Sequence, residues 1–61
     1  MSYAKYAAHR DKKGKTDYKV AIETGIPKST FSDWKNNRSK PKLEKLIKIA
    51  KNLEISIEDL I

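Results

Sequence analysis

The amino-acid sequence predicts an all-α fold of five short helices that form a single domain over residues 1–61. Apolar residues recur at steps of three and four along most of the chain, which is the periodicity of helices packed on a core. Gly14, Gly25 and Ser56 lie between these stretches, where residues that end or start helices belong. No segment has the alternating pattern of a half-buried strand. With 61 residues the chain has room for one small core.

The first helix is predicted over residues 2–13. Tyr3, Tyr6, Ala7 and Arg10 share one face of this helix, and Gly14 supplies its C-terminal stop. The tyrosines predict a packing stripe whose hydroxyl groups reach solvent at the rim of the core, rather than a functional site.

Residues 16–34 have the pattern of a helix-turn-helix, two short helices joined by a tight corner. Thr16 is a suitable N-cap, and Asp17 lies in the first turn, where the helix dipole favours a negative charge. The helix is expected to run to Glu23 or Thr24. Gly25 can take the left-handed conformation that ends it, and Ile26 fills the corner.

The third helix is predicted at about 27–36, with Pro27 at its start. Thr30, Phe31 and Trp34 fall on its inner face. The opposite face carries polar and mostly short side chains, which let a helix backbone approach a base-pair edge: Lys28, Ser29, Ser32, Asp33 and Asn36. An ordinary solvated face is the alternative interpretation. The preceding helix and the tight corner favour a DNA-reading face.

A polar loop follows, in which Asn37 is the residue best suited to a left-handed cap. The fourth helix is predicted from about Lys42 to Leu53, with a stripe of Leu43, Leu46, Ile47, Ile49, Ala50 and Leu53. Ser56 and Asp59 have the spacing of a capping box for a fifth, short helix. The predicted core comprises Tyr6, Val20, Ala21, Ile26, Phe31, Trp34, Leu43, Leu46, Ile47, Ala50, Leu53, Ile55 and Leu60.

The formal net charge of +6 and the pI of about 9.7 favour a polyanionic partner, although lysines that merely solubilise a small domain are the alternative. Four cations and no acid lie between Lys35 and Lys42, whereas three acids and no base lie after Lys51. The absence of cysteine excludes disulfides and cysteine-ligated metals. No run approaches the roughly 18 apolar residues of a membrane span, so a cytoplasmic protein without a membrane partner is expected.

Together these residues resemble the Cro/CI-type (XRE-like) helix-turn-helix domains of phage and bacterial transcriptional regulators. The resemblance rests on the spacing of Val20-Ala21, Gly25-Ile26 and Ser29 to Trp34, and on the tail from Pro41 to Ser56. It implies a compact, five-helix, lambda-repressor-like domain that binds two-fold symmetric operator DNA as a homodimer. By position, the resemblance assigns base reading to Lys28, Ser29, Ser32 and Asp33. It assigns the sugar-phosphate backbone to Lys15, Thr16, Lys19, Asn36, Arg38, Lys40 and Lys42.

The sequence departs from the family pattern at several positions. Asp17 stands where many members have a glutamine that binds a phosphate, and a phosphate would repel it. Arg10 is present, but the position of its usual glutamate partner is Lys35, so that ion pair is expected to be missing. Pro27 replaces a serine or threonine cap, and Glu54 stands where glycine is common.

Other functions are less well supported by the sequence. One histidine, His9 near Asp11, falls short of a metal site or a triad, so neither an enzyme nor a cofactor, metal or small-molecule substrate is expected. RNA binding is disfavoured because no aromatic residue is expected on the contact face. A protein-interaction module on the same fold, favoured by Asp17, is the main alternative. Ile55, Ile57, Leu60 and Ile61 form the candidate dimer surface, and the chain is compatible with a whole regulator or with the N-terminal part of a longer one.

Overall fold

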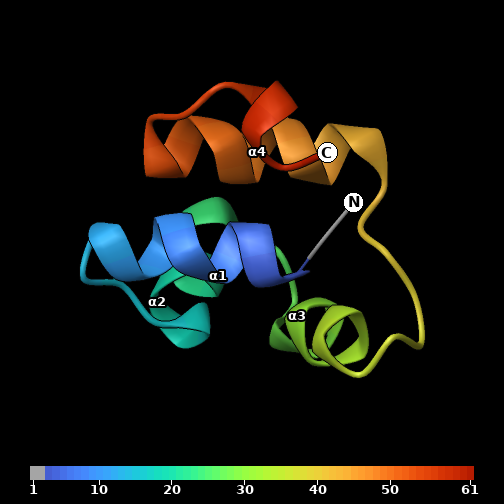
Figure 1. Ribbon diagram of the computed structural model, residues 1–61. Coiled ribbons are helices and arrows are strands. Elements are labelled where there is room, and N and C mark those ends of the chain that lie inside the picture. Colours follow the sequence, from blue (N-terminus) through green and yellow to red (C-terminus); the bar gives the residue numbers. More distant parts are fainter. Residues whose placement is uncertain (1–2) are drawn as a thin grey trace.

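The computed structural model describes residues 3–61, which fold into a body of 25 × 22 × 19 Å. Four α-helices follow one another: α1 (Tyr3–Lys12), α2 (Asp17–Thr24), α3 (Lys28–Lys35) and α4 (Leu43–Leu53). A single 3-10 turn, η1 (Ile57–Asp59), packs on α4 near the end of the chain. Figure 1 shows α1 in front of α2 and α4 above them, with α3 at the lower right, joined to α2 by a short connection. The described residues contain no strand, in agreement with the all-α prediction.

The fifth α-helix was a wrong prediction, although its cap was correctly identified. Ser56 and Asp59 form the capping box, with the Ser56 side chain accepting from Glu58 N–H and Asp59 Oδ2 accepting from Ser56 N–H. The backbone bonds that follow span three residues, from Asp59 to Ser56 and from Leu60 to Ile57. Such bonds make a 3-10 turn, and the fully buried Leu60 follows it.

Local capping fixes the helix-turn-helix as the sequence predicts. Thr16 Oγ1 accepts from Lys19 N–H at 3.1 Å and caps α2. Gly25 ends α2 with φ +74°, and its N–H donates to the Ala21 carbonyl at 2.9 Å. Ile26 is buried in the corner. Together these contacts fix how α3 leaves α2.

Three helix ends carry a left-handed residue in a Schellman motif. The first is Gly14 (φ +67°), which closes α1. After α3 it is Asn37 (φ +58°), as predicted, with Arg38 N–H donating to the Asp33 carbonyl at 2.8 Å. After α4 it is Glu54, whose φ of +58° is strained for a residue with a Cβ. The first helix, predicted over residues 2–13, is described from Tyr3; residue 2 lies outside the described residues.

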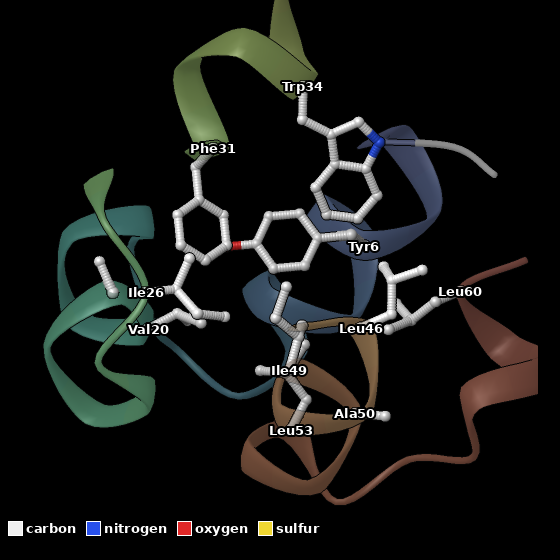
Figure 2. Packing of buried hydrophobic residues seen from close by; sticks show 11 residues of the cluster. Tyr6, Val20, Ile26, Phe31, Trp34, Leu46, Ile49, Ala50, Leu53 and Leu60 are labelled. Carbon is white, nitrogen blue, oxygen red and sulfur yellow. The ribbon is translucent and has the colours of Figure 1, made fainter. Parts of the chain in front are cut away.

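The core is built around a row of three aromatic rings from α1 and α3. In Figure 2 the Tyr6 ring lies between Phe31 and Trp34, with ring centroids 5.5 Å and 5.0 Å away. Aliphatic side chains from α2, α4 and the chain end surround this row. The buried hydrophobic residues are Tyr6, Val20, Ala21, Ile26, Phe31, Trp34, Leu46, Ile49, Ala50, Leu53 and Leu60.

The predicted core was wrong at Leu43 and Ile47, which are 62% and 40% exposed. The buried face of α4 is centred on Leu46, Ile49 and Leu53, and at about 100° per residue Leu43 and Ile47 fall on its flank. Ile55 is partly buried and packs against the core. Between Tyr3 and Ile61, no helix is both long enough and apolar enough to cross a membrane.

Candidate nucleic-acid interface

The outer face of α3 is polar and open, and its inner face is locked into the core. Lys28, Ser29 and Ser32 are exposed, and Asp33 is partly exposed. On the same helix Phe31 and Trp34 are buried. The helix is therefore held from behind while the four residues predicted to read bases point away from the core.

Lys28, the first residue of α3, lies against an aromatic ring of α2. Its Nζ is 5.6 Å from the centroid of the Tyr18 ring, a cation–π distance. Tyr18 itself is 60% exposed. The sequence predicts no aromatic residue on the contact face itself, and Phe31 and Trp34 of α3 are buried; Tyr18 lies beside that face, on the neighbouring helix. Its wide separation from Lys28 in sequence hid the contact.

The loop after α3 presents the predicted phosphate-binding side chains. Asn36, Arg38, Lys40 and Lys42 are all exposed, while Pro41 is buried and anchors the loop to the body. The side-chain amide of Asn36 donates to the Ser32 carbonyl at 2.9 Å, which secures the last turn of α3. Arg38 Nη1 lies 3.9 Å from Asp33 Oδ1, a long ion pair between the loop and the helix.

The predicted backbone contacts around the start of α2 divide into two kinds. Thr16 and Lys19 are exposed, and Lys19 makes only a long, 3.9 Å pair with Glu23. Lys15 is held inside the fold, where its Nζ donates to Glu23 Oε1 at 2.8 Å and to Asn52 Oδ1 at 3.2 Å. The hydrogen bond from Lys15, and after it one from Asn52 Nδ2 at 3.1 Å, lower the pKa of the Glu23 carboxyl. Lys15 ties α2 to the end of α4.

Asp17, expected to repel a phosphate, faces the interior of the domain. Its carboxylate accepts hydrogen bonds from the hydroxyls of Tyr3 and Tyr6 and from Arg10 Nη1, each at 2.7 Å (hereafter the Asp17 network). The hydroxyl of Tyr6 therefore does not reach solvent as predicted, because Tyr6 is fully buried and the partly buried Asp17 supplies its acceptor. Arg10 does not pair at position 35, which is a lysine, as expected. It pairs instead with Asp17 and with the exposed Asp11.

The pKa values of the Asp17 network follow from burial and charge. Burial disfavours the charged form of Asp17, but hydrogen bonds from Tyr6, Tyr3 and Arg10 outweigh burial and lower the pKa of the carboxyl. Burial and the bond to Asp17 raise the pKa of Tyr6 and, to a smaller extent, that of Tyr3. At neutral pH the network therefore holds an ionised carboxylate beside an ionised guanidinium. The sequence signal was a set of polar residues on one face of α1 opposite an acid at the start of α2.

No group of three or more potential metal ligands occurs within residues 3–61. The exposed residues that were predicted to contact DNA lie on α3, on the loop 36–42 and at the start of α2.

Comparison of the sequence with models of known protein families identifies the family of the chain. A helix-turn-helix family model matches residues 7–60, which is nearly the whole chain. The chain belongs to the helix-turn-helix family. This match agrees with the Cro/CI-type (XRE-like) resemblance, and domains of this family are DNA-binding parts of transcriptional regulators. Neither a search of curated proteins nor a search of solved structures found a match.

Proposed function

We propose that this helix-turn-helix domain recognises a specific double-stranded DNA sequence, with α3 in the major groove. The observation that carries the proposal is the outer face of α3, polar and open while Phe31 and Trp34 fix the helix from behind. Lys28 would donate to guanine O6 and N7, and Asp33 would accept from cytosine N4. Ser29 and Ser32 complete the base-reading set and keep the helix surface low enough for close approach.

The sugar-phosphate backbone would be held on both sides of α3. On one side lie four exposed residues of the loop after α3, Asn36, Arg38, Lys40 and Lys42. On the other side lies the start of α2, where Thr16 and Lys19 are exposed. Lys15 is the weakest of the proposed contacts, because its ammonium group would have to leave Glu23 and Asn52 to reach a phosphate. Asp17 does not oppose this contact, since its charge is paired with Arg10.

A homodimer on a two-fold operator is part of the proposal, because one recognition helix reads only a few base pairs. Leu60, first considered for the dimer surface, is fully buried and cannot serve. The exposed apolar side chains near that end of the fold are Leu43 and Ile47 on α4 and Ile61 at the chain end. Since α4 and η1 are in contact, these residues and the partly buried Ile57 are the proposed dimer surface. We propose that the dimer acts in the cytoplasm as a repressor-like transcriptional regulator of a phage or bacterium.

Selection from a random duplex pool at near-physiological salt tests this function. Enrichment of a two-fold symmetric motif with half-sites about one helical turn apart is expected. Failure to enrich any sequence, with binding that falls steeply as salt rises, would show that the basic surface acts without base reading. Sedimentation of the protein with and without the enriched duplex measures the dimer, and a monomer in both states would refute it.

A protein-interaction module remains the second candidate. Pairing of Asp17 with Arg10 removes the residue that favoured it, but Tyr18 and Ile22 give it another basis. These two side chains are one turn apart on α2 and are 60% and 59% exposed. An outcome in which no DNA sequence is enriched would make this surface the next one to test.

A further inference from the structure

We propose that Tyr18 is a positioning residue for base reading, because its ring holds the ammonium group of Lys28 at the start of α3. The inference rests on the proposed function and deepens it, by naming a residue outside α3 that sets base preference. Tyr18 occupies the first turn of α2 and Lys28 begins α3. The Gly25–Pro27 corner brings the two residues together on one surface, where with Ile22 they line a shallow groove.

The Tyr18 ring is the contact that stabilises the charge of Lys28 among the described residues. No ion pair involves Lys28 within residues 3–61, whereas Lys15 and Lys19 of the preceding helix region both lie near Glu23. Its Nζ is 5.6 Å from the centroid of Tyr18, within the range of cation–π attraction. The contact is therefore what restricts the position of a long side chain with many rotamers.

Because Tyr18 is exposed, its ring contributes little to the stability of the fold. It is 60% exposed and lies outside the buried cluster, whereas Tyr6 of α1 is fully buried. Tyr18 makes no side-chain hydrogen bond among the described residues, so replacing it removes the contact with Lys28 and little else.

This contact would act on specificity through its geometry. An ammonium group has three N–H donors, so the ring can hold one side of it while the others donate to a base edge. A lysine held at the groove before binding loses less rotamer freedom in the complex. The effect would be confined to the base pair that Lys28 reads and would leave phosphate contacts unchanged.

NMR of the free protein tests the contact itself. In the parent and in Tyr18→Phe, the ring current should shift the Hε resonances of Lys28 upfield. In Tyr18→Leu, which keeps an apolar side chain but no ring, the shift should disappear. Ile22→Ala is the matched control, because Ile22 is as exposed as Tyr18 and lines the same groove. It should leave the Lys28 resonances in place.

Sequence selection with the same variants tests the consequence. Tyr18→Leu should reduce discrimination at the base pair read by Lys28 about two- to five-fold, which is ~0.5–1 kcal/mol at 1.4 kcal/mol per factor of ten. Tyr18→Phe should retain the parent preference. In a Lys28→Ala background Tyr18→Leu should have no further effect, since the two residues act as a unit.

The outcomes separate this inference from the proposed function. If the parent enriches a sequence but Tyr18→Leu leaves every base preference unchanged, the positioning role is wrong and DNA reading stands. Unshifted Lys28 resonances in the parent would also overturn it. Equal loss in Tyr18→Phe and Tyr18→Leu would point to the hydroxyl instead of the ring face. If the parent enriches nothing, the proposed function fails and the specificity role fails with it.

Discussion

Asp17→Asn removes the charge at the centre of the Asp17 network with little change of shape. The carboxylate accepts three hydrogen bonds at 2.7 Å, from Tyr3, Tyr6 and Arg10. An asparagine offers one acceptor oxygen, and its amide group would face a donor. Arg10, whose side chain is only 17% exposed, would lose its shortest ion pair.

The loss of unfolding free energy in Asp17→Asn depends on which interactions Arg10 and the tyrosines keep. Removing one partner of a buried ion pair costs about 3–5 kcal/mol, and a hydrogen bond to a charged group contributes about 1.5–3 kcal/mol. Arg10 keeps Asp11, and the Asp17 side chain is 24% exposed, so the loss should be smaller than for a fully buried pair, and we expect about 2 kcal/mol. A chain of this size is stable by roughly 3–9 kcal/mol, and the melting temperature should therefore fall by about 8–16 °C.

The pH dependence gives the same experiment a second readout. Because the pKa of Asp17 is lowered in the folded state, the unfolded chain binds the proton first as the pH falls. The stabilisation is therefore present at neutral pH and is lost as the pH falls below the ordinary value of 3.8 and through the folded pKa. Melting curves of parent and Asp17→Asn should differ most at neutral pH and converge as the pH falls through the lowered pKa of Asp17 in the folded state.

Asp11→Asn is the matched control, because Asp11 contacts the same guanidinium at 2.9 Å but is 68% exposed. This variant should lose less than about 1 kcal/mol. If Asp17→Asn melts within about 2 °C of the parent at pH 7, the network contributes little. If the difference between the two proteins stays constant as the pH falls through the lowered pKa of Asp17, the ionised carboxylate of Asp17 is not its source.

Three further changes test the core, the proposed interface and the strained cap. Trp34→Ala should unfold the domain or nearly so, because losing a buried tryptophan costs about 3–5 kcal/mol; cooperative melting near the parent temperature would show that the ring is dispensable. Lys28→Ala should leave melting unchanged and relax base preference by about 1–3 kcal/mol, measured by competition between duplexes; equal weakening on all sequences would make Lys28 a phosphate contact. Glu54→Gly should raise stability by about 1 kcal/mol in denaturant titration, because glycine adopts φ +58° without strain; a loss would mean that the exposed pair with Lys13 outweighs the strain.

Features set by neighbouring residues could be predicted from the sequence. The bounds of α2 depend on the Thr16 cap and on Gly25, both of which act within one turn of the helix they limit. Asn37 takes the left-handed cap for the same local reason. The separation of Phe31 and Trp34 from the polar face of α3 follows from helical spacing alone. These features together give the helix-turn-helix and the residues that it exposes.

Features set by contacts between helices could not be predicted in this way. The apolar stripe of α4 is wider than its buried face, and periodicity does not show that Leu43 and Ile47 lie on the uncovered flank. The partners of Asp17 and Lys15 come from segments 7 to 37 residues away in sequence. Polar groups form such pairs because the fold brings them together, so spacing along the chain places them on a helix face but does not identify their partners.

The ion pairs of the fold decide which charges remain available to DNA. Asp17 and Glu23, the acids of α2, are paired with Arg10 and Lys15, so their fields are largely neutralised within the body. Asp33 and Arg38 are joined only at 3.9 Å, with Asp33 partly exposed and Arg38 exposed, so separating them costs less than about 1 kcal/mol. On the proposed function, Asp33 could then bind a base and Arg38 a phosphate. Binding by either residue would break their mutual contact and so release the other. On the proposed function, the fold pairs the two acids of α2 internally, which also occupies Lys15, and leaves Lys19, Lys28 and the cations of the loop after α3 exposed.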